Sequence, residues 1–368
     1  MSFIAERMGC IDASGIRKIF ALAAKMQDPI NLSIGQPDFD VDEVVKSEAI
    51  TQIEAGFNRY TQTWGIDELR QAASDYYENR FGVPLNNVMV TSGVSGGLFL
   101  ALMATLNPGD EVLCADPYFV MYKHLTNDLG GTCVPIDTYP DFKLRPAAVE
   151  AAITERTKVL IVNSPSNPTG VTLTGDELAA LAAVAKKHNL LVLSDEIYEQ
   201  FHYDHAPGTM VGHYDNIVLL NGFSKMSAMT GWRVGFAAGP EEVIQKMNTL
   251  QQYTFVCAPS FAQKAAVVAL KQDPTEKIDS YRVKRDLIYG LLSEKMTITK
   301  PGGAFYIFPE APGGDGEAFV KKAIENNVLI IPGSVFSERN THFRISFAAT
   351  DDTLRRGAEV LNRLAEAY

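Results

Sequence analysis

The feature that most constrains the fold is a series of short apolar segments that alternate with helical patterns through the middle of the chain. Six of them have the length of a β-strand, at residues 88–91, 111–115, 159–163, 190–194, 217–221 and 234–238. Their apolar residues are continuous, which is typical of parallel strands covered on both faces. The pattern predicts an α/β fold with a large, mostly parallel central sheet covered by helices.

The intervening segments carry helical signals, and the pattern changes near the C-terminal end. In residues 175–188 the apolar side chains share one face, and Asn189 is suited to end that helix. After about residue 275 come a charged helical segment at 277–295, a helix, strands at 328–331 and 342–347, and a final helix. We expect an arm with part of a small domain at 1–44, a large domain at 45–275 and a small α+β domain at 276–368.

Composition excludes several classes of protein. The 368 residues carry a formal net charge of −11, which argues against a general nucleic-acid binder. The start of the chain lacks the pattern of a signal peptide, and no apolar run is long enough to span a membrane. The four cysteines are scattered with no C-x-x-C pair, which indicates free thiols in a reducing compartment. We therefore expect a soluble, cytoplasmic protein.

Two loops that follow predicted strands have the composition of anion or ligand sites. Residues 91–97 read Thr-Ser-Gly-Val-Ser-Gly-Gly and precede an apolar helix, whose first N–H groups suit an anion. Residues 163–170 read Asn-Ser-Pro-Ser-Asn-Pro-Thr-Gly at the carboxyl end of a strand, the edge where ligands bind in open α/β sheets. Taken alone, either loop is equally well explained as a simple turn.

Lys225 is the strongest single candidate for chemistry. It follows a predicted buried strand and lies among small and apolar residues, so removal from water is expected to lower its pKa. A neutral amine is a nucleophile towards an aldehyde. Arg233 lies eight residues later and could hold a phosphate by a forked contact. The alternative is an ordinary surface lysine.

Two further charged residues are predicted to be buried. Asp195 follows an apolar strand, where a carboxylate needs a cationic partner from the protein or from a ligand. Arg344 alternates with apolar residues in a short strand and suits a planar grip on a substrate carboxylate. For both residues, an internal ion pair remains the alternative.

Taken together and in this order, these segments resemble the class I aminotransferases of the aspartate-aminotransferase superfamily, which are fold-type I pyridoxal-phosphate (PLP) enzymes. The resemblance covers nearly the whole chain, from Asn-Leu-Ser-Ile-Gly-Gln-Pro-Asp-Phe at 31–39, through Tyr60, Gly65 and Leu69-Arg70, to Arg344. It implies a central sheet of the seven-stranded type in a large PLP-binding domain, beside the smaller α+β domain.

The resemblance also implies catalytic roles. Lys225 matches the lysine that carries PLP as a Schiff base and then shuttles the proton. Asp195 matches the aspartate that pairs with the protonated pyridine nitrogen and keeps the ring an electron sink. Tyr198 and Asn167 match the groups that hydrogen-bond the cofactor's phenolic oxygen.

Further cofactor contacts follow from the same comparison. Phe119 matches the aromatic residue stacked on the pyridine ring, and Val94, Ser95 and Arg233 match the phosphate site. Tyr60 resembles the tyrosine that reaches the phosphate from the other subunit. The resemblance therefore implies a homodimer with shared active sites.

Substrate binding and mechanism are implied in the same way. Arg344 would hold the α-carboxylate, assisted by Asn167 and the backbone of Gly35. The implied reaction moves an amino group between an L-amino acid and a 2-oxo acid by ping-pong kinetics.

The chain departs from the family pattern at two places. Gly222 stands three residues before Lys225, where many relatives have a serine or threonine that bonds the phosphate, so one phosphate contact is expected to be lost or replaced. Ser95 stands where aspartate-specific relatives use a basic residue, and residues 14–16 read Ser-Gly-Ile. These features favour apolar or aromatic donors, with Ile16, Tyr118 and Tyr122 as candidate pocket lining.

Three other functions are compatible with parts of the sequence. A PLP-dependent carbon–sulfur β-lyase would share the lysine, the aspartate and both arginines, and the products would distinguish it. A PLP-binding transcriptional regulator would need a DNA-binding domain and a different charge. A metal site at His202, Asp204, His205 and His213 fits no known spacing, so these residues are interpreted as an exposed loop, and no metal is expected.

Overall fold

The computed structural model describes residues 3–11, 15–16, 19, 24 and 26–368. Its α-helices are α2 (Glu43–Glu54), α3 (Asp67–Phe81), α4 (Gly93–Thr105), α5 (Val120–Asp128), α6 (Pro146–Ala152), α7 (Gly175–Lys187), α8 (Glu241–Tyr253), α9 (Ser260–Ala269), α10 (Thr275–Leu292), α11 (Gly316–Glu325) and α12 (Asp351–Ala365). Short 3₁₀ helices lie at η1 (Glu6–Cys10), η2 (Thr230–Trp232), η3 (Pro312–Gly314) and η4 (Gly333–Val335).

A seven-stranded sheet forms the centre of the molecule and confirms the predicted fold class. Its strands are β2 (Met89–Thr91), β3 (Glu111–Asp116), β4 (Thr132–Asp137), β5 (Thr157–Asn163), β6 (Leu191–Asp195), β7 (Ile217–Gly222) and β8 (Gly235–Ala238). The spatial order is β2-β8-β7-β6-β5-β3-β4. The five neighbouring strands β4, β3, β5, β6 and β7 run parallel, while β8 is antiparallel to both β7 and β2. The sheet is therefore mostly parallel, as the continuous apolar runs indicated.

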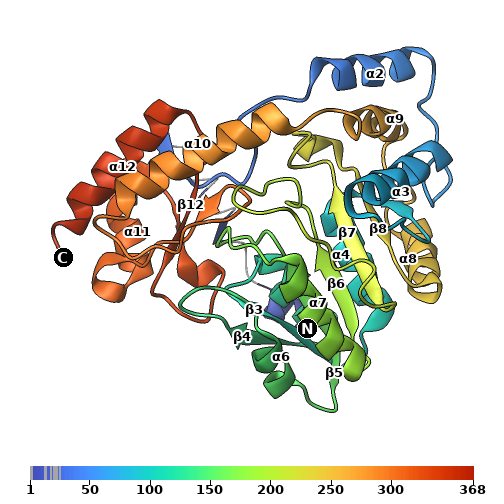
Figure 1. Ribbon diagram of the computed structural model, residues 1–368, viewed down its shortest axis with the longest axis horizontal. Coiled ribbons are helices and arrows are strands. Elements are labelled where there is room, and N and C mark those ends of the chain that lie inside the picture. Colours follow the sequence, from blue (N-terminus) through green and yellow to red (C-terminus); the bar gives the residue numbers. More distant parts are fainter. Residues whose placement is uncertain (1–2, 12–14, 17–18, 20–23, 25) are drawn as a thin grey trace.

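Successive residues of the central strands pack against helices on opposite faces of the sheet. Leu113 of β3 joins a cluster with α6 and α7, while its neighbours Val112 and Cys114 join a cluster with α4, α5 and α8. Figure 1 shows α7 in front of the sheet. Burial on both faces explains why these strands lack the alternation of a half-exposed strand.

The C-terminal part forms a second, smaller α+β unit. A three-stranded sheet has the order β11 (Ile331–Pro332), β12 (Phe343–Ser346) and β9 (Tyr306–Ile307), and α10, α11 and α12 pack around it. Near the start of the chain, β1 (Ile30–Asn31) pairs in parallel with β10 (Val328–Leu329), so residues far apart in sequence share a sheet. Figure 1 shows α10 running from α12 towards α9.

Two details of the predicted strands were wrong. The single strand expected at 328–331 is divided: Val328 and Leu329 pair with β1, whereas Ile331 pairs with Arg344 of β12. Strand β4 was missed altogether because its sequence, Thr-Cys-Val-Pro-Ile-Asp, has no continuous apolar run and contains a proline. It lies at the edge of the sheet and is partly exposed. Neither difference alters the layer architecture.

Helix α7 matches its prediction closely and shows why its ends lie where they do. Thr174 and Glu177 form a reciprocal capping box at the N-terminus. At the other end, Asn189 has a φ of 53°, the left-handed conformation that commonly follows a helix. None of the helices that the structure describes is long and apolar enough to cross a membrane.

Candidate active site

A cavity of about 530 Å³ lies where the carboxyl ends of β5, β6 and β7 meet the start of α4 and the C-terminal unit. This size suits a cofactor together with a small substrate. Its wall includes twelve residues singled out from the sequence: Ile16, Gly35, Val94, Ser95, Phe119, Tyr122, Asn167, Asp195, Tyr198, Lys225, Arg233 and Arg344.

Lys225 lies at the centre of the wall, three residues after the end of β7. Its Nζ donates to the carbonyl oxygen of Gly35 over 2.8 Å. Its pKa is lowered to about 8, chiefly by removal from bulk water and also by the charges of Arg344 and Arg233, while Asp195 opposes the change. A substantial share of the amine is therefore neutral near pH 8, so Lys225 can act as a nucleophile or a base.

Asp195 ends β6 and is 4% exposed. Its Oδ2 accepts from the Tyr122 hydroxyl over 2.7 Å, and its Oδ1 accepts a longer bond of 3.3 Å from the Ile197 amide. Burial raises the pKa of Asp195, whereas those hydrogen bonds and Lys225 lower it. Both hydrogen-bond donors are neutral, and no cation among the described residues forms an ion pair with Asp195, so the carboxylate is available to a cationic group in the cavity.

The side chain of Asn163 joins β6 to the polar loop that follows β5. Its Nδ2 donates to the backbone oxygen of Asp195 over 2.9 Å, and its Oδ1 accepts from the amide of Asn167 over 3.0 Å. Asn167 is 6% exposed. The loop is therefore fixed to the strand that carries Asp195, which makes it more than a solvent-exposed turn.

An anion cradle lies at the start of α4. Gly93 has a φ of 67°, and a Cβ there would lie 2.6 Å from Nη2 of Arg233, so glycine allows the close approach. Among the described residues, the Arg233 guanidinium donates to two carbonyl oxygens, those of Thr230 over 2.9 Å and Ser92 over 3.3 Å. The Ser92 side chain does not cap α4 in this part of the chain, so the first amides of the helix suit an anion.

Arg344 provides a second cation, on β12 and 1% exposed. It donates to Asn167 Oδ1 over 3.0 Å and to the backbone oxygen of Ser33 over 2.8 Å, while its buried Nε has no hydrogen-bond partner within the described ranges. Burial lowers its pKa. In the part of the chain that the structure describes, its hydrogen-bond partners are neutral oxygens and it forms no salt bridge, so Arg344 suits a ligand carboxylate.

Comparison with known proteins agrees with this geometry. A family model described as aminotransferase class I and II matches residues 27–361. The chain belongs to this family. The aminotransferase is 38% identical to the aspartate/prephenate aminotransferase of Cereibacter sphaeroides, with 96% of each chain covered. It is 35% identical to aromatic-amino-acid aminotransferase 2 of Thermococcus litoralis, with 98% of each covered.

Solved structures give the same result for the fold. The structure of aspartate aminotransferase from Thermus thermophilus with maleate has a TM-score of 0.95 at 33% identity, and the match covers 99% of this chain and 100% of that one. The fold of the aminotransferase is thus the PLP-dependent transferase fold that the sequence predicted.

Not every residue singled out from the sequence belongs to the cavity. Tyr60 is 83% exposed and does not line it. Ile16 and Tyr122 do line it, but Tyr118 borders only a small adjoining cavity of about 30 Å³, with its hydroxyl donating to Glu338 over 2.7 Å. Ser14 lies outside the described residues.

Gly222 lacks a side chain for a steric reason. A Cβ at this position would lie 2.8 Å from Cα of Gly235 on the neighbouring strand, so the backbones of β7 and β8 approach too closely for serine. The hydroxyl residues Ser224 and Thr230 line the cavity and could replace the contact expected at position 222.

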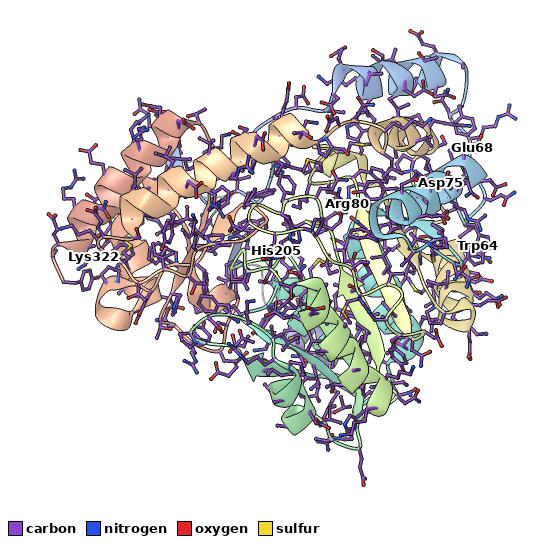
Figure 2. All side chains as sticks on the ribbon, viewed as in Figure 1. Trp64, Glu68, Asp75, Arg80, His205 and Lys322 are labelled. Carbon is purple, nitrogen blue, oxygen red and sulfur yellow. The ribbon has the colours of Figure 1, made fainter. Side chains whose placement is uncertain are left out.

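The interpretation of residues 202–213 as an exposed loop was wrong at its start. His202 is 8% exposed and forms a β-bridge with Gly303, while His205 shares a hydrogen bond with Thr172 over 2.7 Å. Figure 2 shows His205 near the middle of the molecule. No group of side chains suited to a metal ion was found in the described part of the chain.

The sequence patterns predicted no role for Tyr306 and indicated Tyr122 only as a candidate for the pocket lining. Both tyrosines reach the cavity, where Tyr122 holds Asp195 and Tyr306 contacts Tyr198 and Arg344. Tyr306 lies in the segment Gly-Gly-Ala-Phe-Tyr at 302–306, and the available signal was the apolar and aromatic run Ala-Phe-Tyr-Ile-Phe at 304–308.

Proposed function

We propose that this aminotransferase uses PLP bound at Lys225 to move an amino group between an L-amino acid with an apolar or aromatic side chain and a 2-oxo acid. The observation that carries the proposal is the set of incompletely paired charges around one cavity. Lys225, Arg233 and Arg344 donate to neutral oxygens, and Asp195 accepts from neutral donors. Buried charges with this incomplete pairing are suited to bind a ligand with complementary charges.

The residues around the cavity fit PLP group by group. The cradle at Arg233, with Val94 and Ser95 at the start of α4, would hold the phosphate. Asp195 would pair with the pyridine nitrogen, Phe119 would cover the ring face, and Tyr198 and Asn167 would bond the phenolic oxygen. When bound, PLP supplies an electron-withdrawing ring that stabilises negative charge at the substrate's α-carbon.

The protein's own groups would then bind the substrate and move the proton. Arg344 would bind the α-carboxylate with Asn167, and the backbone of Gly35 would complete that site. Lys225 would take the proton from the α-carbon, for which its lowered pKa is suited. Because there is one Arg344 in the site, the amino acid and the oxo acid would occupy it in turn, which supports a ping-pong sequence.

The lining around the substrate position supports an apolar donor. Beyond Lys225, Arg233 and Arg344, the described lining contains no lysine or arginine that could bind a distal carboxylate. Apolar residues from the N-terminal segment and from α4 and α5 are present instead: Ile11, Ile16, Val94, Met121 and Leu125. An aliphatic or aromatic side chain would gain about 25 cal/mol for each Å² buried there.

A homodimer is also part of the proposal. Tyr60, Tyr253, Phe255 and Val256 are exposed. They belong to neighbouring segments, since Ser260 donates to the backbone oxygen of Phe57 over 2.8 Å. The Phe255 ring lies beside the anion cradle, because a Cβ placed on Gly96 of α4 would be 3.6 Å from it. This surface supports a partner subunit that brings its own Tyr60 towards the cavity.

Mixed subunits test the shared site. A Lys225→Ala subunit and a Tyr60→Ala subunit are each expected to be weakly active alone at limiting PLP. Random mixing should restore about a quarter of the wild-type sites, because one site of each hybrid dimer keeps both residues. Activity no greater than the sum of the separate variants would contradict the shared site.

The reaction itself is tested with a panel of donors and 2-oxoglutarate. Phenylalanine and leucine are expected to give a kcat/KM at least roughly tenfold above that of aspartate. The products should be glutamate and the 2-oxo acid derived from the donor. Lys225→Ala should lose about a thousandfold or more, whereas the exposed Lys246→Ala should not change the rate. Ammonia released from a donor without any oxo acid would contradict amino transfer.

A further inference from the structure

Two tyrosine hydroxyls meet at the edge of the cavity. Tyr198 Oη and Tyr306 Oη lie 2.8 Å apart, and the side chains are 3% and 1% exposed. Either oxygen can donate to the other. Within the described part of the chain, the Tyr306 hydroxyl has no other hydrogen-bond partner.

Tyr306 is also in contact with Arg344. The guanidinium carbon lies 4.5 Å from the centre of the Tyr306 ring, which is the distance of a cation–π contact. On the other side, a Cβ on Gly35 would lie 2.7 Å from the Tyr306 hydroxyl, so the backbone of Gly35 closes over that oxygen. Tyr306 therefore touches the proposed carboxylate site and the proposed cofactor site at once.

The proton count limits what this pair can do. Each hydroxyl has one proton to donate. Tyr198 can therefore donate a hydrogen bond to a cofactor oxygen and keep its bond to Tyr306 only if Tyr306 is the donor between the two tyrosines. Burial raises the pKa of both tyrosines, and the charge of Arg344 opposes that rise at each. The Arg344 guanidinium lies against the Tyr306 ring, and a cation beside a phenol makes its hydroxyl a better donor, which favours Tyr306 as the donor of the pair.

We infer that Tyr306 is a positioning residue whose hydroxyl donates a hydrogen bond to the Tyr198 oxygen. The Tyr198 hydroxyl is thereby directed to donate to the phenolic oxygen of PLP. The ring of Tyr306 meanwhile supports Arg344. The inference rests on the proposed function. It assigns to Tyr306 an effect on the cofactor without direct contact, because a hydroxyl that accepts a hydrogen bond becomes a stronger donor.

The sign of the effect follows from the chemistry of a phenol. A donor to the phenolic oxygen stabilises its anionic form, so the bound cofactor loses its proton at a lower pH when Tyr198 donates strongly. Tyr306→Phe removes the support and keeps the ring. We expect the pH at which the visible band of bound PLP changes to rise by about half a unit.

The test is a pH titration of the absorbance of the PLP-loaded enzyme. Tyr306→Phe and Tyr198→Phe should both raise the transition, Tyr198→Phe by more, and the double variant should match Tyr198→Phe alone. Tyr203→Phe, which removes another buried hydroxyl from the same packed cluster, serves as the matched control and should not move the transition.

A second measurement separates the hydroxyl from the ring. Tyr306→Phe should leave KM for amino acids within about twofold, whereas Tyr306→Leu, which removes the ring beside Arg344, should raise KM roughly tenfold. The inference is overturned if Tyr306→Phe leaves the transition at the wild-type pH, or if its shift persists in the Tyr198→Phe background. A wild-type enzyme without any PLP band would reject the proposed function instead.

Discussion

Asp195 and Glu196 are adjacent in the sequence, both buried, and yet placed in opposite situations. Glu196 is 3% exposed, and four donors satisfy its carboxylate: Ser194, Thr209, the Met210 amide and Tyr77, over 2.8–3.0 Å. Asp195 has one short bond from Tyr122 and one long bond from Ile197, and it faces the cavity. One carboxylate is fully satisfied by the protein, while the other is left for a ligand.

The same contrast extends to the neighbouring charges. Glu199, one turn after Glu196, accepts from Arg80 over 2.9 Å and from Tyr76 over 2.5 Å, which ties α3 to this segment (Figure 2 shows Arg80). On the cavity side, neither Arg233 nor Arg344 has a carboxylate partner among the residues that the structure describes. Burial alone therefore does not mark a functional residue in this fold, but burial with incomplete pairing does.

The largest effect should come from exchanging the two carboxylates for amides. Asp195→Asn should reduce amino transfer by about a thousandfold, because the charge that would pair with the cofactor is lost. Glu196→Gln should keep the rate within about fivefold, since Glu196 does not line the cavity. Steady-state rates of both variants check this, and a Glu196→Gln loss as large as that of Asp195→Asn would break the distinction.

A smaller effect concerns pH and stability. Burial raises the pKa of Glu196 to about 7, above its usual 4.5, despite the hydrogen bonds that lower it. The folded protein thus keeps a proton that the unfolded chain releases, so this group's contribution to stability falls as pH rises from 4.5 to 7, by up to about 3 kcal/mol.

Glu196→Gln has no such proton to hold. Its free energy of unfolding relative to wild type should therefore improve between pH 5 and 7.5, as followed by urea unfolding at each pH. A difference between the two proteins that does not vary with pH would mean that Glu196 is ionised in the fold throughout this range.

The smallest expected effect tests Gly222. Gly222→Ser would force apart two strands whose backbones nearly touch at Gly235, at a cost of about 1–3 kcal/mol. Thermal unfolding of the PLP-free protein measures it. A Gly222→Ser protein that is as stable as wild type and binds PLP more tightly would show that the missing phosphate contact, and not close packing, is the consequence of this glycine.

The sequence predicted those parts of the fold that depend on local pattern. The apolar runs located β2, β3 and β5–β8, and the pattern at 175–188 located α7. The edge strand β4 has no continuous apolar run. At Ile330 the chain passes from one sheet to another while every side chain stays buried, so hydrophobicity carries no signal of the break.

The candidate site was predicted by motif, and the missed contacts are long-range. Lys225, Asp195 and Arg344 follow strands or alternate within them, and they meet at one cavity. The hydrogen bond between Tyr198 and Tyr306 joins residues 108 positions apart. No local pattern reveals such a pair. The prediction that His202 is exposed failed for the same reason. Its β-bridge to Gly303 joins distant residues, and the polar residues that follow His202 in the sequence indicate only a loop.

The central claim is that Lys225 forms the covalent attachment to PLP. Borohydride reduction of the PLP-loaded protein, followed by peptide mass spectrometry, tests it directly. We predict that the reduced phosphopyridoxyl group is found on Lys225, that Lys246→Ala labels to the same extent, and that Lys225→Ala does not label at the site. A label on another lysine in the wild type, or equal labelling of Lys225→Ala, would contradict the account.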